Sequence, residues 1–233
     1  MTRRRRRCGA RPAGRRGTRD ALRVERLLSG WTAAVGDDGA AAGRHLVRRY
    51  AEPHRQYHDR QHLMEVLDAL RVLRAGGDVP PTVVCAAYGH DVIYDPAAAD
   101  NEQRSAALTA SVLRRLGKPS VFVDEVVRLV LLTATHSPAA QDEDGAMLCD
   151  ADLAVLAAPD QRYREYASAV RREYGHLSDE AFRSGRTAVL RELVGRPRLY
   201  ATPEGVRRWD GAARRNMRRE LTRLDGTAAD PQP

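Results

Sequence analysis

Apolar residues recur with the period of an α-helix in the first half of the chain. They stand at positions i, i+3, i+4, i+7 and i+10, which lie along one side of a helix: Leu63, Val66, Leu67, Leu70 and Leu73. Such a side has to be covered by other elements before the helix is stable. Alternating stretches rich in Val, Ile, Thr and aromatic residues, which indicate strands, are absent from the sequence. We therefore expect an all-α protein.

Further apolar runs predict a series of helices along the chain, with Asp20, Asn101 and Ser120 as N-caps and Thr202-Pro203-Glu204 as a helix start. The expected helices are Ala21–Trp31, Ala40–Tyr50, one that starts near His58 and runs through Leu73, one over 81–94, Glu102–Leu116, Val121–Thr135, Met147–Ala157, Gln161–Tyr174, Asp179–Val194 and Pro203–Leu221. No repeat or long linker divides them. We expect a single domain over 20–222, with disordered tails at 1–19 and 223–233.

The net charge of +8 is concentrated in the N-terminal tail. Residues 1–19 hold nine arginines and no acid, so the rest of the chain has 39 minus nine, or 30, basic side chains against 31 acidic ones. A near-neutral domain is not typical of nucleic-acid-binding proteins. Only the basic tail favours a nucleic acid as partner, and a translation start placed too far upstream also explains that tail.

The apolar runs and the cysteines indicate the compartment in which the protein is found. No apolar run approaches the ~18 residues that a membrane span requires, so we expect no membrane partner. The three cysteines, Cys8, Cys85 and Cys149, are odd in number and lack metal-ligand spacing. They favour a reducing, cytoplasmic setting without disulfides, in which Cys85 is a small core residue.

Histidines and acids stand near helix ends or beside apolar stripes, where a lone ionisable group is costly to bury. The residues concerned are His58 or His62, His90, Asp91, His136, and Asp150 or Asp152. Two or more imidazoles together with carboxylates are suitable ligands for Mn, Fe, Co, Ni or Zn, whereas Mg prefers more oxygen ligands. Taken singly, each of these groups is more typical of a hydrogen-bonded structural position than of a metal ligand.

The order of these residues along successive helices resembles the HD-domain superfamily of metal-dependent phosphohydrolases. The longer motifs resemble a bacterial group of predicted metal-dependent HD-superfamily phosphohydrolases, from about Leu22 to Leu221. The motifs are Arg55-Gln56-Tyr57-His58-x3-His62, Gly89-His90-Asp91-Val92-Ile93-Tyr94-Asp95, Asn101-Glu102-x2-Ser105-Ala106, Thr135-His136, Asp150-Ala151-Asp152-Leu153-Ala154-Val155-Leu156, Tyr163-x2-Tyr166, Arg172-Glu173-Tyr174, Gly185-Arg186-x3-Leu190 and Asn216-x3-Glu220. The resemblance implies a helical bundle of the HD-domain type.

The resemblance also implies a set of metal ligands, which are His62, His90, Asp91 and Asp152. The expected cofactor is one divalent transition metal, Mn, Co, Ni, Fe or Zn, in preference to Mg. His58 then orients His62 or contacts the substrate. Asp150 supports a ligand or accepts hydrogen bonds at a helix start.

The chemistry implied is hydrolysis of a phosphoester or pyrophosphate bond by metal-activated water. Arg55 is expected to contact phosphoryl oxygens, or to be a solvated surface residue. Asp95 or Glu102 is expected to act as general acid or base, or else to cap a helix or close a salt bridge. His136 donates to a phosphate oxygen or the leaving group, holds a second metal ion, or interacts with a helix C-terminus.

By analogy with the superfamily, the substrate is a nucleotide or a similar small phosphorylated metabolite. The alternative is a non-catalytic sensor module that binds a nucleotide in the same pocket. The sequence leaves the metal, the substrate and the oligomeric state open. Arg186, Asn216 and Glu220 are expected to link the terminal helices to the core.

Overall fold

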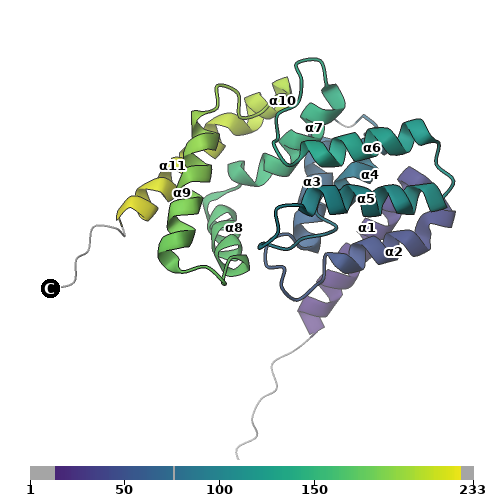
Figure 1. The fold of residues 1–233 in the computed structure, drawn as a ribbon, viewed down its shortest axis with the longest axis horizontal. Helices are drawn as coiled ribbons and strands as arrows, with labels where there is room; N and C mark the ends of the chain where they lie inside the picture. Colours follow the sequence, from purple (N-terminus) through teal and green to yellow (C-terminus); the bar gives the residue numbers. More distant parts are fainter. Residues whose placement is uncertain (1–13, 76, 227–233) are drawn as a thin grey trace, which may run out of the picture.

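Helices joined by loops make up the part of the chain that the computed structural model describes, residues 14–75 and 77–226, and no strand occurs within it (Figure 1). The elements are α1 (Gly14–Val35), η1 (Asp37–Gly39), α2 (Ala40–Arg49), α3 (Arg60–Leu73), α4 (Pro81–Gly89), α5 (Asn101–Arg115), α6 (Ser120–Leu132), α7 (Glu143–Asp152), η2 (Leu153–Ala157), α8 (Asp160–Glu173), α9 (Asp179–Gly195), α10 (Pro203–Gly205), η3 (Val206–Asp210) and α11 (Gly211–Gly226). This arrangement confirms the all-α, single-domain prediction.

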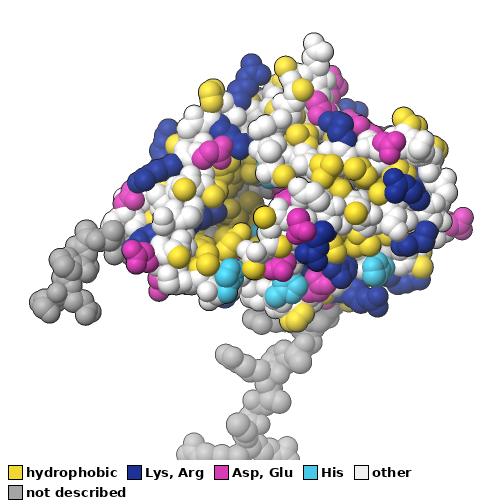
Figure 2. Space-filling model, viewed as in Figure 1, with side chains coloured by type: hydrophobic (Ala, Val, Ile, Leu, Met, Phe, Trp, Pro, Cys, Tyr) yellow, Lys and Arg dark blue, Asp and Glu magenta, His cyan; other side chains and the backbone are white. Residues whose placement is uncertain are grey.

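Two hydrophobic cores hold these helices together. Helices α1 to α7 bury the larger one, around side chains such as Trp31, Tyr88 and Leu129. The smaller core lies among η2, α8, α9 and α11, around Tyr163 and Leu190. In Figure 1, α8, α9 and α11 lie on one side of the molecule and α1 to α6 on the other. Figure 2 shows a hollow between the two sides, with hydrophobic side chains inside it.

The first turn of α3 is fixed by a side-chain cap. The carboxylate of Asp59 accepts hydrogen bonds from the backbone N–H groups of Gln61 (2.7 Å) and His62 (3.2 Å). Such a cap satisfies donors that have no partner within the helix. The predicted apolar side of α3 is buried, with the exception of half-buried Leu73. Because His62 precedes this side directly, its imidazole is carried into the interior.

Helix α4 ends at Gly89, five residues before the predicted end at position 94. The guanidinium of Arg55 binds the carbonyls of Asp91 and Val92, and the hydroxyl of Ser105 binds both backbone polar groups of Ile93. These contacts replace the hydrogen bonds that a longer helix would make. The prediction was wrong because the partners come from elements distant in sequence.

The close packing of α4 against α5 requires a glycine at position 89. A Cβ atom on Gly89 would lie 2.5 Å from the hydroxyl oxygen of Thr109 on α5. Only glycine allows α4 and α5 to approach so closely. The end of α4 is therefore held against α5, immediately before His90.

Other boundaries also differ from the prediction. Helix α1 begins at Gly14, so Asp20 is not its N-cap and instead forms an ion pair with Arg60 (2.8 Å). Helix α5 begins at Asn101, whose side-chain amide binds the backbone of Asp95 and does not cap the helix. Residues 1–13 and 227–233, which include most of the expected tails, lie outside the described residues.

Helices in the second half show further differences. Ser120 is the first residue of α6 and not its cap, and that helix ends at Leu132. Helix α7 begins at Glu143 and passes into the short helix η2 after Asp152. The predicted helix start at Thr202 is confirmed, since its hydroxyl accepts from the N–H of Gly205. Within residues 14–75 and 77–226, none of the helices combines the length and apolarity that a membrane crossing requires.

Candidate metal centre

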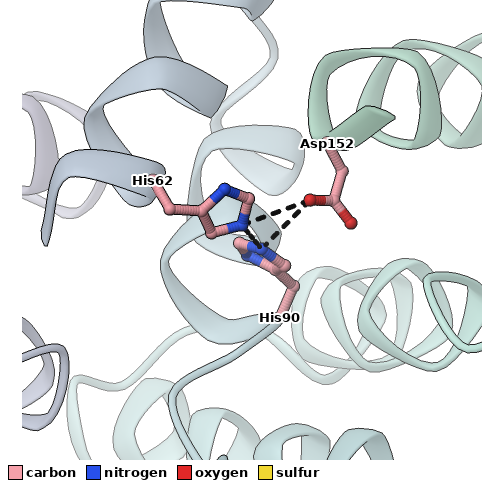
Figure 3. Close-up of side chains that lie close together, drawn as sticks. All are labelled: His62, His90 and Asp152. Carbon is pink, nitrogen blue, oxygen red and sulfur yellow. Dashed lines mark hydrogen bonds and ion pairs between the residues drawn. The ribbon is translucent and has the colours of Figure 1, made fainter. Parts of the chain in front are cut away.

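Three side chains, from α3, from the residue that follows α4 and from α7, point toward one another in the interior (Figure 3). The Nε2 atoms of His62 and His90 lie 3.0 Å apart. One carboxylate oxygen of Asp152, Oδ1, lies 3.2 Å from Nε2 of His62 and 3.6 Å from Nε2 of His90. All three ligand atoms lie within 4.8 Å of one another. The imidazoles are almost fully buried, at 2% and 1% exposure.

Asp91 adds a second carboxylate to this group. Its Oδ2 lies 3.3 Å from Nε2 of His62 and 3.1 Å from Nε2 of His90. Neighbouring residues within a helix point in different directions. Because α4 ends at Gly89, the side chains of His90 and Asp91 nevertheless reach the same point.

The donor set and its spacing fit a divalent transition metal. Ligand atoms about 2.1 Å from an ion and about 90–110° apart lie about 3.0–3.4 Å from each other. Four of the five distances given above fall in this range, and the fifth, 3.6 Å, exceeds it slightly. Nδ1–H of His90 donates to the carbonyl of Ala87 (2.7 Å), which leaves the lone pair on Nε2 directed at the group.

Opposite charges also hold the group together. Burial by itself lowers the pKa of His62, but hydrogen bonds to Asp152 and Asp91 outweigh it and raise that pKa to about 9. Burial opposes protonation of His90 as well, and the charge of Asp91 raises its pKa well above the usual value. The carboxyl groups of Asp91 and Asp152 have pKa values well below the usual one, because the charge of His90 outweighs their burial. A metal ion would take the place of protons on the imidazoles.

His136 holds the carboxylate of Asp152 from the other side. Its Nε2 donates to Oδ2 of Asp152 at 2.7 Å, while Oδ1 faces the two imidazoles. The backbone of His136 has a positive φ of 48°, and its carbonyl accepts from Arg196. A non-glycine residue in this conformation costs about 1 kcal/mol or more. Of the interpretations left open by the sequence, none included this contact with a ligand carboxylate.

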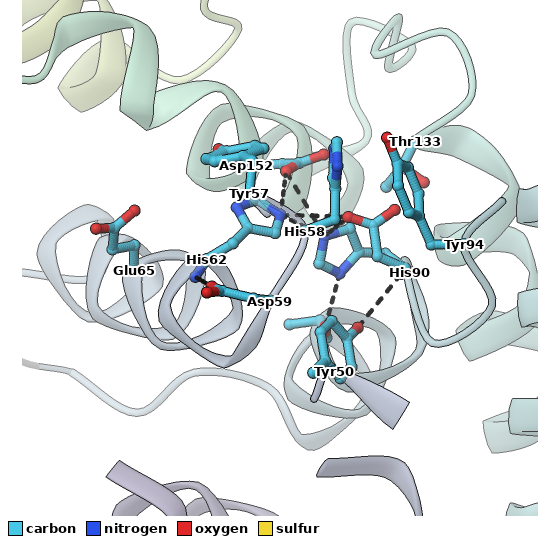
Figure 4. Close-up of polar contacts among 12 residues, drawn as sticks. Tyr50, Tyr57, His58, Asp59, His62, Glu65, His90, Tyr94, Thr133 and Asp152 are labelled. Atoms are coloured by element: carbon cyan, nitrogen blue, oxygen red, sulfur yellow. Dashed lines mark hydrogen bonds and ion pairs between the residues drawn. The ribbon is translucent and has the colours of Figure 1, made fainter. Parts of the chain in front are cut away.

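His58 is turned toward a different partner. Its Nδ1 donates to Oε2 of Glu173 at 2.7 Å, and its ring stacks on Tyr94 with centroids 4.1 Å apart (Figure 4). The other oxygen of Glu173 accepts from the backbone N–H groups of residues 56–58. These bonds outweigh burial and lower the pKa of Glu173 to about 2. The structure thus brings His62, and not His58, into the group that could hold a metal ion.

A cavity of about 330 Å³ opens beside the group. Most of its lining is polar and comes from α5, from α7, and from the segments before α3 and after α4, α6 and α8: His58, Asp91, Tyr94, Ala98, Ala99, Asn101, Glu102, Thr133, His136, Asp152 and Tyr174. Its size lies at the lower end of the range for small-molecule sites. Two of the predicted metal ligands, Asp91 and Asp152, are therefore accessible from the cavity.

Glu102 and Asp95, the two predicted acid–base residues, occupy different places. Glu102 lines the cavity, and its carboxylate has no hydrogen bond or ion pair with any residue the structure describes. Asp95 is exposed and does not line the cavity, and its carboxylate accepts from the N–H of Ala97 in a turn. Of the two, only Glu102 lines the cavity, and Asp95 has a role in the turn.

Arg55 is buried, and its guanidinium is engaged with the carboxylate of Glu52 and with three backbone carbonyls. Its guanidinium donates to the carbonyls of His58 (2.9 Å), Asp91 (2.7 Å) and Val92 (3.1 Å). It therefore joins the segment before α3 to the segment after α4, and the expectation that it contacts a phosphate finds no support here. The alternative, a solvated surface arginine, is wrong because the side chain is buried.

Asp150 lies away from the two imidazoles. Its carboxylate accepts from the backbone N–H groups of Ala201 (2.7 Å) and Thr202 (2.8 Å), just before α10. This contact matches the prediction of an acceptor at a helix start. Asp152, two residues later, supplies a carboxylate to the group that could hold a metal ion.

Sequence reasoning missed the roles of two residues at the site. Glu173 was noticed only as part of a motif, yet it stands at i+7 from Tyr166, on the buried face of α8. An acid on an apolar face is a recognisable signal of a paired group. Tyr50 was missed as well: its hydroxyl donates to the carbonyl of Tyr88 and accepts from the N–H of Asp91. Nothing in the sequence near Tyr50 indicates these contacts.

No family model, curated protein or solved structure matches this chain. The class of the protein is therefore defined by its fold and its site. It is an all-α protein with a buried group, His62, His90 and Asp152, that could hold a metal ion. The HD-type architecture stays a prediction from the sequence motifs.

Proposed function

We propose that the protein is a metal-dependent phosphohydrolase of the HD type. The observation that carries this proposal is the approach of His62, His90, Asp91 and Asp152 to one point beside a polar cavity. Imidazole and carboxylate ligands suit one divalent transition metal, Mn, Co, Ni, Fe or Zn. A metal ion held there lowers the pKa of a water molecule and polarises a phosphoryl group.

Residues of the cavity wall supply the remaining chemistry. Glu102 has an unpaired carboxylate, which is suited to accept the proton of an attacking water. His58 is held by Glu173 through Nδ1, so its Nε2 is the nitrogen left for the substrate, and it can donate to the leaving oxygen when the ring carries a proton on both nitrogens. His136 keeps the carboxylate of Asp152 in place. Their positions favour a phosphoester bond lying between Glu102 and His58.

The charge of the cavity favours substrates that carry little negative charge. Among the described residues that line it, there is no lysine or arginine. A phosphate chain of several negative charges needs cationic side chains around it. We therefore place phosphate monoesters before triphosphates as substrates, with nucleotides as one class to be tested.

A metal analysis combined with a substrate panel tests the proposal. The purified chain is expected to contain a stoichiometric transition metal and to release phosphate from at least one of a panel of nucleotides and small phosphorylated metabolites, assayed with Mn, Co, Ni and Mg. Substitutions His90→Ala and Asp152→Ala should remove both metal and turnover. His45→Ala, at an exposed position of α2, is the matched control and should change neither.

Two results would contradict the proposal. One is full activity in His90→Ala, and the other is the absence of metal-dependent phosphate release from every substrate. Tight nucleotide binding without turnover would instead indicate the sensor module that the sequence left as the alternative.

A further inference from the structure

Aromatic rings line a second cavity of about 330 Å³, which lies between the segment before α3, the helices α8 and α9, and the loop that joins them. The rings are those of Tyr57, Tyr166, Tyr174 and Phe182, and aliphatic side chains such as Val189 complete the wall. We name this cavity the aromatic chamber. Flat, apolar walls favour an aromatic or other flat apolar ligand.

The aromatic chamber adjoins the cavity at the metal centre. His58 and Tyr174 line both cavities. The ring of His58 lies between Tyr57, on the side of the chamber, and Tyr94, on the side of the metal centre, with centroid distances of 4.8 and 4.1 Å. The ring of Tyr57 in turn lies 4.7 Å from the ring of His62. A single side chain therefore separates the chamber from a metal ligand.

The charge of the arginine in the chamber wall is paired within the protein. This arginine, Arg186, is buried and forms two hydrogen bonds with Glu220, at 2.8 and 3.1 Å. The same guanidinium donates to the hydroxyl of Tyr166 (3.1 Å) and lies over the ring of that residue. Because its charge is already neutralised, Arg186 is not available to a second phosphate. The chamber suits an uncharged group.

We propose that the aromatic chamber receives a flat, uncharged ring of a substrate whose phosphate lies at the metal centre. The substrate class is then a phosphoester of an aromatic or heteroaromatic compound. This inference rests on the proposed function, because it takes the metal centre as the place of the phosphate. The two cavities together have room for a phosphate and one ring system.

Gly185 allows the chamber to be filled without disturbing the fold. It lines the chamber, and a Cβ atom built on it would meet no atom within 4 Å. The substitution Gly185→Leu therefore places a side chain in the chamber. Gly195, at the exposed end of the same helix, also has open space around a Cβ and does not line the chamber. Gly195→Leu is the matched control.

Binding of two phosphonates to the Mn²⁺-loaded chain, measured by calorimetry, tests the inference. Phenylphosphonate should bind at least about tenfold more tightly than methylphosphonate to the wild type and to Gly195→Leu, since only the former carries a ring to bury. In Gly185→Leu this preference should disappear, while binding of methylphosphonate is retained. Adenosine 5′-phosphonate shows whether a nucleobase fills the chamber as well; a preference for either ring supports the inference.

Equal affinities in the wild type, or a preference that survives in Gly185→Leu, would overturn the inference. Failure of the proposed function is distinguishable from this result. A protein that prefers the ring but hydrolyses no phosphoester contradicts the proposed function alone, whereas an active enzyme without ring preference contradicts the aromatic chamber alone. A chain that binds neither phosphonate contradicts the inference as well.

Discussion

Glu173 holds His58 through both of its carboxylate oxygens, although 115 residues separate them: Oε2 accepts from the imidazole Nδ1 at 2.7 Å, and Oε1 accepts from the backbone N–H at 3.0 Å. The pair fixes the position of the ring and the tautomer in which Nε2 is free. It also ties α8, on one side of the molecule, to the segment before α3 on the other.

Glu173→Gln should lower turnover without removing the metal. A neutral amide replaces the carboxylate that orients the His58 ring, so we expect kcat to fall about 10–100-fold. Metal content should remain that of the wild type, because neither residue belongs to the metal-binding group. Glu165→Gln, at an exposed position of the same helix, is the control. Equal kcat in both variants would show that the pair has no role in catalysis.

The free energy of unfolding should fall at acid pH because the carboxylate of Glu173 becomes protonated. The pKa of Glu173 is lowered to about 2 in the folded protein, against 4.5 as its ordinary value. A lowered pKa stabilises the folded state above pH 4.5, and this stabilisation is lost as the pH falls toward 2. The shift corresponds to about 3 kcal/mol at neutral pH and about half of that at pH 3. Urea unfolding of the wild type and of Glu173→Gln measures this effect. The difference between their free energies of unfolding should decrease from pH 7 to pH 3, and a constant difference would contradict the prediction.

Metal affinity should increase with pH. The pKa of His62 is raised to about 9 in the metal-free protein, and that of His90 is raised as well, so the proton between their facing Nε2 atoms must leave when a metal binds. We expect the apparent affinity for Mn²⁺ or Co²⁺ to rise by about one decade per pH unit between pH 6 and 8, since one proton is released. Calorimetry in buffers of different ionisation enthalpy counts the released protons. An affinity independent of pH would exclude the two imidazoles as ligands.

Arg55→Lys should destabilise the fold and weaken metal binding. Lysine retains the charge but cannot reach the carbonyls of His58, Asp91 and Val92 at once. We expect the free energy of unfolding to fall by about 2–4 kcal/mol, since bonds from a charged donor are lost inside the protein. Arg48→Lys, at an exposed position, is the control and should change little. If the two variants are equally stable, Arg55 does not join these segments.

Loss of one partner of the buried ion pair between Arg186 and Glu220 should destabilise the protein strongly. Glu220→Gln leaves the charge of Arg186 without its counter-ion, and we expect a loss of about 3–5 kcal/mol in chemical unfolding. Asp225→Asn removes the partner of Arg191 in an exposed pair and should cost at most about 1 kcal/mol. Similar losses in the two variants would contradict the assignment of the buried pair as a structural link.

Local patterns in the sequence determined the fold class and the helices. The period of apolar residues around Leu63 to Leu73 predicts a buried helix face, and such a pattern depends only on residues within a few turns of each other. The chemistry of the site was also visible, as a set of histidines and acids near helix ends. Among them, His62, His90 and Asp152 do lie close enough to hold a metal ion.

Only the tertiary structure decided which of these side chains meet. His62 enters the group and His58 does not, because Glu173, distant in sequence, takes the latter as its partner. His90 and Asp91 share a point because Arg55 and other distant residues end α4 early. The direction of a side chain at a helix end depends on where the helix stops, and that is determined by hydrogen-bond partners from other elements, which no local pattern records.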